Sequence, residues 1–361
     1  MEDKNRIVFA ASKVGASHLP KGMPCQDYSL KVDTEGLQMV VVCDGHGSKT
    51  YVRSDVGSRL AAEIAKKNIL KFVDDTSPLL FKGKKGAVTA RPSWDDDLWG
   101  ATPKKPIEAM TEVELLNYEQ DKQFFEQVKD IREQDAALQE LFSAIYSDWL
   151  KAIQEDSENN PFTEKEKEAL GDKQLVKAYG TTLMAFVETP EYWFSFHIGD
   201  GRIVAVNRLF EMTDPVPWDC NCFQNFTTSL CNTEPVRLFR YAFDGTGKFP
   251  TAVFCCSDGI EDSYGDYTLA PQYLHNWYLG LLNEFATKGE EDTLAKINSF
   301  LPILSEKGSK DDMSLAAIIH KDDLVDSLKV SEIKSQMRVL DEQKEQLQHQ
   351  LDEIVARIKE L

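Results

Sequence analysis

The chain has 361 residues, 42% hydrophobic and 28% charged, which is enough to bury a sizeable core in one large domain or two small ones. Its formal net charge of −19 argues against a general nucleic-acid or anionic-membrane surface, because such surfaces need a basic face. Residues 1–6 are charged and no apolar run approaches the roughly 20 residues of a membrane span, so we expect neither a signal peptide nor a membrane helix.

Strand-like segments dominate both ends of the predicted core. Short runs rich in β-branched and aromatic residues predict strands within residues 7–12, 25–30, 37–44, 181–188, 192–198, 202–207, 236–243, 251–257 and 314–319. The strands are segregated from the predicted helices and do not alternate with them. This pattern favours an α+β domain of packed antiparallel sheets, which we place at residues 1–322.

Helices are predicted in the middle of the chain. From Ser54 apolar residues recur near helical spacing, with Ser54 or Asp55 as the candidate N-cap. Helical spacing returns at residues 113–155. Between these two regions, residues 75–111 are rich in Pro, Gly, Lys and Asp and predict a long irregular insertion.

The tail, residues 323–361, carries an unbroken heptad pattern. The a positions from 330 to 358 and the d positions from 333 to 361 are apolar except Lys344. This regularity predicts a coiled coil with another chain, most simply a homodimer. The alternative is an amphipathic helix that folds back on its own domain.

Aspartates stand at the ends of several predicted strands, often beside a glycine. Any one Asp-Gly pair is typical of a turn, but here the pattern recurs, at Asp27, Asp44, Asp200, Asp258 and Asp311. If these strand ends converge, the carboxylates repel one another unless they are protonated or neutralised by cations. Hard divalent ions such as Mg²⁺ and Mn²⁺ take oxygen ligands, and a glycine would let a backbone carbonyl join them.

Six motifs carry a resemblance to a known family. "CQDYS", "VCDGHGS", "YGTTLMAF", "GDGR", "CSDGIED" and "GSKDDMS" occur in the order and approximate spacing of the metal-dependent protein phosphatases of type 2C, between residues 7 and 320. The stretch "GASHLPKGMPCQD" resembles the bacterial branch. The resemblance implies a β-sandwich of two antiparallel sheets flanked by helices, with a binuclear Mn²⁺ or Mg²⁺ centre at one end.

The resemblance also implies roles for individual residues. Asp44 is similar to the carboxylate that bridges both metal ions, and the Gly45 carbonyl to the backbone ligand of the second ion. Asp258 and Asp311 match the other carboxylates of the first ion. Asp27 resembles the early aspartate near the site.

Other positions match the residues that bind a third ion and the residue that acts as general acid. Asp200, with Asp258, matches the positions that hold a third, weaker ion in bacterial relatives. His46 resembles the histidine proposed there as the general acid for the leaving alkoxide. Thr181 and Thr182 match a turn that we interpret as structural.

The sequence departs from the family at two places. Many members have a phosphate-gripping arginine where this chain has Gly22, so His18 or Lys21 could take its place in phosphate binding. Asp312 stands where asparagine is usual. Its added charge would tighten metal binding or raise a neighbouring pKa, and the sequence leaves both open.

These features predict a cytoplasmic, metal-dependent phosphatase that acts on phosphoserine and phosphothreonine in proteins. The alternatives are a catalytically weak phosphoprotein-binding scaffold and a phosphatase of small phosphoesters. Seven cysteines, an odd number, indicate a reduced compartment. Cys220, Cys222 and Cys231 could suggest a second metal site, but no fourth ligand is evident, and the interpretation as half-buried packing residues is favoured.

Overall fold

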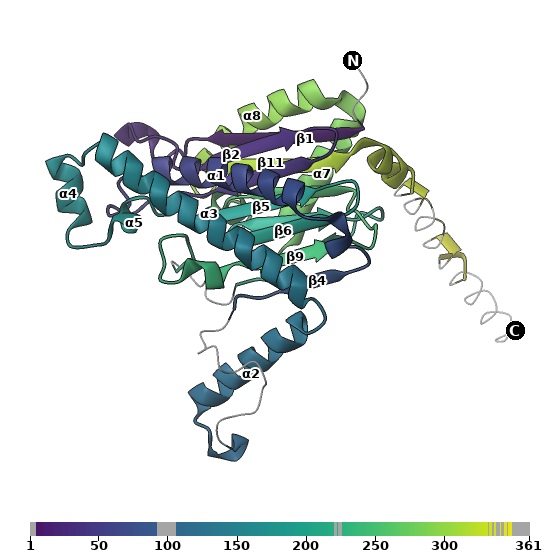
Figure 1. Cartoon of the computed structure of the whole chain (residues 1–361). Helices are drawn as coiled ribbons and strands as arrows, with labels where there is room; N and C mark the ends of the chain where they lie inside the picture. Colours follow the sequence, from purple (N-terminus) through teal and green to yellow (C-terminus); the bar gives the residue numbers. More distant parts are fainter. Residues whose placement is uncertain are drawn as a thin grey trace, which may run out of the picture.

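Two antiparallel sheets packed face to face form the centre of the molecule, with helices on both outer faces (Figure 1). This arrangement confirms the predicted α+β sandwich. The computed structural model describes residues 5–91, 106–219, 222, 226–330, 332, 333, 336, 340, 343, 344 and 346–348.

The first sheet has the strand order β1-β11-β10-β7-β8. Its strands are β1 (Arg6–Lys13), β11 (Met313–His320), β10 (Ala252–Cys256), β7 (Arg202–Val206) and β8 (Met212–Thr213). All neighbours pair antiparallel. The strand latest in the sequence therefore lies in the interior of this sheet, with Ile7 opposite Ile319.

The second sheet has the strand order β2-β3-β5-β6-β9-β4. Its strands are β2 (Tyr28–Asp33), β3 (Gln38–Cys43), β5 (Leu183–Glu188), β6 (Trp193–Ile198), β9 (Arg240–Asp244) and β4 (Lys85–Val88). The predicted segment 236–243 becomes a strand only from Arg240, because residues 235–238 form a 3-10 turn, η5 (Pro235–Leu238).

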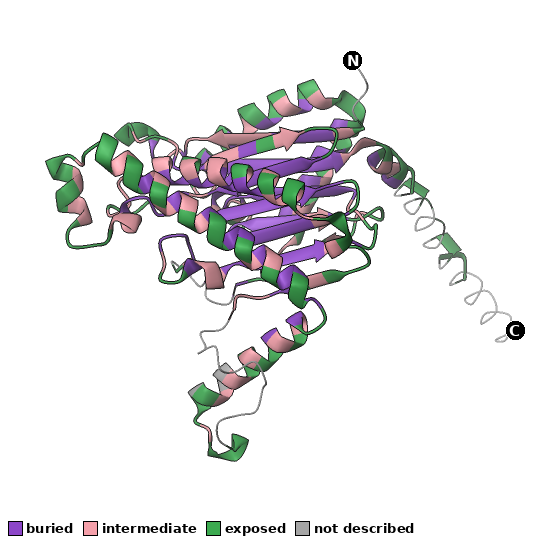
Figure 2. Cartoon of the chain, in the orientation of Figure 1, coloured by how far each residue is buried: buried purple, intermediate pink, exposed green. Residues whose placement is uncertain are grey.

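The central strands are buried on both faces, as the purple interior of Figure 2 shows. In β3, Val40 and Val42 pack into the core between the two sheets. Met39 and Val41 point the other way, into the core beneath the helices. Because successive side chains of a strand point to opposite faces, burial of both faces explains why this strand is a continuous apolar run.

Two helical layers cover the sandwich. Helices α1 (Ser54–Asp75) and α3 (Arg132–Asn159) cover the second sheet, and α7 (Gln272–Lys288) and α8 (Glu290–Lys307) cover the first. The predicted helix from Ser54 is confirmed, but its predicted cap is wrong. Arg53 holds the N-cap position without a capping side-chain bond, because its guanidinium is engaged elsewhere.

The stretch predicted to be irregular, 75–111, contains a strand that the sequence prediction missed. β4 pairs with β9 at the edge of the second sheet. The short 3-10 turns η2 (Pro78–Leu80) and η4 (Ile107–Ala109) lie on either side of it in sequence, and residues 92–105 are outside the described part. The next helix, α2 (Glu112–Val128), projects away from the sandwich (Figure 1).

Beyond β11, residues 321–330 are helical, and Leu324 and Ser327 are buried against the domain. Most of the predicted heptad segment lies outside the described residues. None of the helices in the described part of the chain is both long and apolar enough to cross a membrane.

Candidate metal centre

In the second sheet, the strand register brings two of the predicted aspartates together. β2 begins where β3 ends, since Tyr28 lies opposite Cys43. Asp27 immediately precedes Tyr28, and Asp44 immediately follows Cys43. The two carboxylates therefore come from neighbouring strands at the same end of the sheet.

The first sheet delivers three more aspartates to its corresponding end. β10 ends where β7 and β11 begin. Asp200 precedes β7, Asp311 precedes β11, and Asp258 begins the short helix α6 (Asp258–Asp262) that follows β10. All five aspartates predicted from the sequence thus stand at strand ends.

The charges of these carboxylates act on the pKa values of their neighbours. Burial raises the pKa of Asp44 well above its usual range, and the charges of Asp27 and Asp258 raise it further. Burial and then the charge of Asp200 raise the pKa of Asp258 to about 7. Burial likewise raises the pKa of Asp27 and of Asp200. When ionised, these carboxylates repel one another, as expected for a site that binds a cation.

The backbone at Asp44 is fixed by the turn that contains Thr181 and Thr182. The Asp44 N–H donates to the Thr182 hydroxyl (3.0 Å). The Asp44 carbonyl accepts from the Thr181 hydroxyl (2.9 Å) and from the Thr182 N–H (2.8 Å). The two threonines therefore hold the aspartate in place from outside the cluster, consistent with the structural role predicted for them.

A steric constraint that the sequence did not reveal requires a glycine at position 45. A Cβ at this position would lie 2.4 Å from the Gln26 carbonyl oxygen and 2.8 Å from that of Ser54. Gly259, after Asp258, is similar, since a Cβ there would lie 2.1 Å from the Asp312 carbonyl oxygen. Close backbone approach at this end of the sandwich requires both glycines.

His46 follows Gly45 and is tied to the same turn. Its N–H donates to the Gly180 carbonyl (3.1 Å), and its ring lies 4.6 Å from that of Tyr51. Burial, together with the charge of Lys177, lowers the pKa of His46 to about 4. The ring is therefore neutral at pH 7 in the protein without bound ions or substrate.

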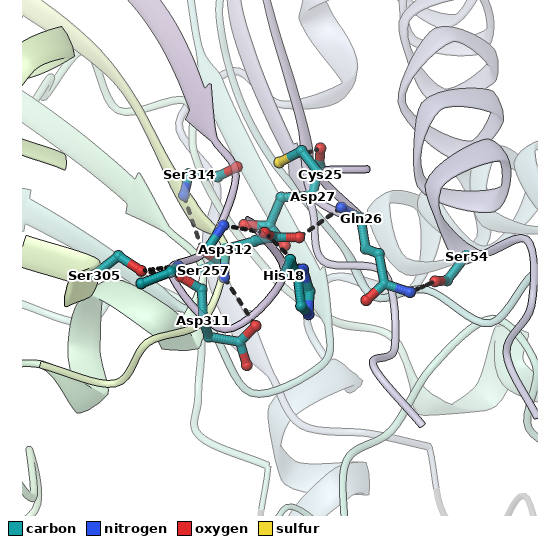
Figure 3. Close-up of polar contacts among 12 residues, drawn as sticks. His18, Cys25, Gln26, Asp27, Ser54, Ser257, Ser305, Asp311, Asp312 and Ser314 are labelled. Carbon is teal, nitrogen blue, oxygen red and sulfur yellow. Dashed lines mark hydrogen bonds and ion pairs between the residues drawn. The ribbon is translucent and has the colours of Figure 1, made fainter. Parts of the chain in front are cut away.

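Asp312 is the hub of a second cluster, shown in Figure 3. Its carboxylate accepts from the backbone N–H groups of Gly15 and Gln26, and it lies 3.0 Å from Nδ1 of His18. Its charge also raises the pKa of Asp27. The aspartate that replaces the usual asparagine thus ties residues 15–26 to the start of β11 and acts on a neighbouring pKa, one of the two effects left open by the sequence.

The two candidate phosphate-binding residues are placed differently. His18 is buried, and its Nδ1 is engaged by Asp312. Lys21 is exposed at the end of a 3-10 turn, η1 (Leu19–Lys21). Gly22, which follows, adopts a left-handed conformation (φ 62°) with open space around its α-carbon.

Sequence reasoning missed two supporting features. The charge of Asp262 contributes to the raised pKa of Asp258, and its spacing of four residues from Asp258, one helical turn, was a usable signal. Arg202 forms two bonds of 2.7 Å to Glu261 and lies between the rings of Trp218 and Tyr267. This pairing joins the start of β7 to α6, and no local pattern predicts it.

The donor set fits a hard divalent cation. Oδ2 of Asp27 is buried without a hydrogen-bond partner in the described part of the chain, as a site of oxygen ligands would leave it. Within the described residues, no group of three or more His, Cys, Asp and Glu side chains is arranged to hold an ion by itself. Mg²⁺ usually keeps several waters, so water would complete the ligand set that these carboxylates begin.

Of the three cysteines considered as a second metal site, two are described. Cys222 lies 3.6 Å from the Thr228 hydroxyl, and Cys231 lies 3.0 Å from the Ser229 hydroxyl. Both are buried free thiols, whereas Cys220 is outside the described residues. These contacts agree with the favoured interpretation as packing residues.

Comparison with protein families matches residues 14–297 to the family described as Protein phosphatase 2C. Among solved structures, a bacterial serine phosphatase variant is 12% identical, with a TM-score of 0.46, covering 87% of this chain and 97% of that one. PppA of Pseudomonas aeruginosa is 13% identical (TM-score 0.43; 87% and 97% covered). The catalytic domain of the serine threonine protein phosphatase PstP, in complex with 2 manganese ions, is 15% identical (TM-score 0.43; 87% and 97% covered). Comparison with curated proteins gives no match.

Proposed function

The chain belongs to the protein phosphatase 2C family. We propose that it is a serine/threonine phosphatase, which hydrolyses phosphoserine and phosphothreonine in proteins at a centre that binds Mn²⁺ or Mg²⁺. The observation that carries this proposal is the cluster of strand-end aspartates whose charges raise one another's pKa values. Such a cluster is unfavourable when ionised and becomes favourable when divalent cations neutralise it.

The residues that would hold the ions are those at the strand ends. Asp44, Asp258 and Asp311, with the Gly45 carbonyl, are the proposed ligands of two ions, and Asp200 with Asp258 those of a third. Asp27 lies beside them. When bound, two divalent ions lower the pKa of a water molecule, orient it and neutralise phosphate charge.

His46 is the proposed donor of a proton to the serine or threonine oxygen that leaves. A ring with a pKa of about 4 carries little of this proton at pH 7. We propose that a phosphate oxygen that is not neutralised by the metal ions accepts a hydrogen bond from the protonated ring, so that His46 acquires its acidic proton in the substrate complex. The hydrogen bond from the backbone N–H of His46 to the Gly180 carbonyl keeps the residue beside Asp44.

Removal and return of metal ions tests the proposal. We expect the chelator-treated protein to hydrolyse neither phosphoserine peptides nor p-nitrophenyl phosphate, and Mn²⁺ or Mg²⁺ to restore both activities. A release assay for inorganic phosphate measures each. Turnover that survives chelation would contradict the proposed centre. Binding of phosphopeptides without turnover would favour the alternative of a phosphoprotein-binding scaffold. A preference for small phosphoesters would favour the alternative of a small-phosphoester phosphatase.

We further propose that the tail pairs with a second copy of the chain. Ile333, Leu340 and Leu347, seven residues apart, are exposed by 56%, 62% and 64% in this chain alone. A stripe of this kind is an association surface. The proposed location is the cytoplasm, since the six described cysteines are free thiols.

Deleting residues 331–361 is expected to give a monomer whose turnover of p-nitrophenyl phosphate is nearly unchanged. The cut follows Val330 because Leu324 and Ser327 are buried against the domain and should be kept. Every proposed metal ligand precedes the cut. Light scattering of both proteins over a range of concentrations measures the change. If the full-length chain is already a monomer throughout, the dimer proposal fails.

A further inference from the structure

An apolar cleft of about 640 Å³ lies at one edge of the sandwich, where the space between the two sheets opens to solvent. Residues of β7 and β8 line the cleft from the first sheet, and residues of β9 and β4 line it from the second, whose outermost strand is β4 (Figure 1). Trp193, which begins β6, lines the cleft, whereas Asp200 lies beyond the other end of that strand. The cleft is therefore at the end of the sandwich opposite the aspartates and is separate from the candidate metal centre.

Small side chains leave this space open. Ala87 of β4 pairs with Ala242 of β9. Ala205 of β7 pairs with Thr213 of β8, and all four residues line the cleft. Packed sheets lie about 10 Å apart, and alanine side chains on facing strands do not fill that distance. Because β8 has only two residues, the first sheet gives little cover to this face of β4, and Ala87 is exposed.

The wall of the cleft is held by contacts within the protein. The Trp193 indole stacks on the Phe186 ring, with centroids 5.4 Å apart, and its Nε1 donates to the Lys248 carbonyl (3.0 Å). The Asp244 carboxylate accepts from the N–H (2.7 Å) and from the hydroxyl (2.6 Å) of Thr246, which fixes the turn between β9 and Lys248. The cleft is therefore preformed. Its volume lies within the range of roughly 300–1,000 Å³ that is usual for sites of small organic ligands, and like them it is lined mainly by apolar groups.

Two lysines make the rim of the cleft positive. Lys85 and Lys248 line the cleft, are exposed, and form no ion pair with any carboxylate of the described residues. Asp244 is the one acidic residue in the lining that the structure describes. It lies opposite Lys85 in the strand register, but its carboxylate is engaged by Thr246. In a chain of net charge −19, two unpaired cations beside an apolar cleft favour a ligand that is both apolar and anionic.

We propose that this cleft binds an amphipathic anion of the class of long-chain carboxylates, with the apolar chain between the sheets and the carboxylate at Lys85 and Lys248. The chain supplies most of the affinity, because it leaves water for an apolar surface. The ion pairs contribute less, because both lysines are exposed, and they select an anion over a cation. The inference is independent of the proposed phosphatase function, since no residue of the cleft is a proposed metal ligand.

Calorimetry on the metal-free, full-length chain tests the inference with three probes. Dodecanoate, below its micelle concentration, carries both the chain and the anion. Dodecyltrimethylammonium carries the chain with a cation, and acetate carries the anion without the chain. The metal-free protein is used because its aspartate cluster repels anions and offers them no second site. We expect saturable binding of one dodecanoate per chain, an affinity about tenfold or more lower for the cation, and no detectable binding of acetate.

Two variants and a control locate the bound carboxylate. Joint replacement Lys85→Glu and Lys248→Glu is expected to weaken dodecanoate binding by about tenfold or more, because two attractions become repulsions. Ala87→Trp should abolish it, because the indole fills the cleft from an exposed strand position that tolerates an aromatic residue. Lys71→Glu, at an exposed position of α1, changes the net charge away from the cleft and should leave the affinity unchanged. In all variants the melting temperature, and the turnover of p-nitrophenyl phosphate with Mn²⁺, should match those of the wild-type chain.

Three results would overturn the inference. The first is equal affinity for dodecanoate and dodecyltrimethylammonium. The second is dodecanoate binding that is unchanged in either cleft variant, which would place the ligand elsewhere on the chain. The third is the absence of saturable binding. In that case, a change in the oligomeric state of Ala87→Trp, measured by light scattering, would assign the cleft to a second copy of the chain.

Discussion

Replacing Asp44 with asparagine is expected to lower kcat/KM by about 10³-fold or more, because metal-ion stabilisation supplies several kcal/mol to such reactions. Asparagine keeps the shape of the side chain and removes its charge. The fold should persist, since Thr181 and Thr182 hold the backbone of Asp44 and not its carboxylate. Calorimetric titration with Mn²⁺ should show weakened binding alongside the lost turnover.

The metal-free protein offers a second readout for Asp44→Asn. Burial and neighbouring charges raise the pKa values of Asp44 and Asp258, the latter to about 7. A carboxyl whose pKa is raised on folding makes the folded state less stable as pH rises from its unfolded pKa, about 4, towards the folded one. Removing one charge should therefore stabilise the metal-free protein at pH 7.5 and change its melting temperature little at pH 4.

A matched control exists at the opposite end of the same sheet. Asp33 ends β2, whereas Asp27 precedes it, so Asp33 is a strand-end aspartate far from the cluster. Asp33→Asn should leave Mn²⁺ affinity and turnover unchanged. Normal affinity and normal turnover in Asp44→Asn itself would disprove the assignment of the centre.

His46→Ala is expected to slow the hydrolysis of phosphoserine by about 10²–10⁴-fold, the usual worth of general-acid catalysis, and that of p-nitrophenyl phosphate far less. Serine leaves as a strongly basic alkoxide that needs a proton, whereas p-nitrophenolate is a stable anion. Comparing kcat for the two substrates in one variant measures the difference. Any loss of folding or metal binding slows both substrates alike, so the comparison contains its own control.

An equal slowing of both substrates would show that His46 positions Asp44 or the substrate and donates no proton. The lowered pKa of His46 makes this experiment a stringent test of the proposal that His46 donates a proton. Burial and the charge of Lys177 favour the neutral ring in the metal-free protein, so the proposal requires the substrate complex to stabilise the protonated form.

Local pattern was sufficient to predict most strands and the type of fold. The continuous apolar run of β3 indicates burial on both faces, and the helical spacing of apolar residues from Ser54 predicts α1. The strand β4, with only four residues and a glycine, has no alternation to detect and exists because β9 pairs with it. The wrong N-cap for α1 has a similar cause, since the tertiary contacts of Arg53 determine where the helix begins.

The identity of the candidate site residues could be predicted from the sequence, but the groups that surround them could not. Aspartates at strand ends could be read directly, since the end of an apolar run is a local signal. The partners of those residues could not, because they come from distant segments: Thr182 supports Asp44, and Gly15 and His18 hold Asp312. The pKa of His46 depends on burial and on Lys177, which no spacing in the sequence connects to it.

The interior position of β11 has a consequence for biosynthesis. This strand lies between β1 and β10, so two strands made earlier wait for a partner that leaves the ribosome much later. Until then both present open edges, which are prone to wrong pairing and aggregation. Asp311, a proposed metal ligand, arrives with the same segment, so a nascent chain would complete the proposed centre only together with its fold. The high contact order of this pairing predicts slow folding, and chaperones that bind open strand edges would protect the chain during that interval.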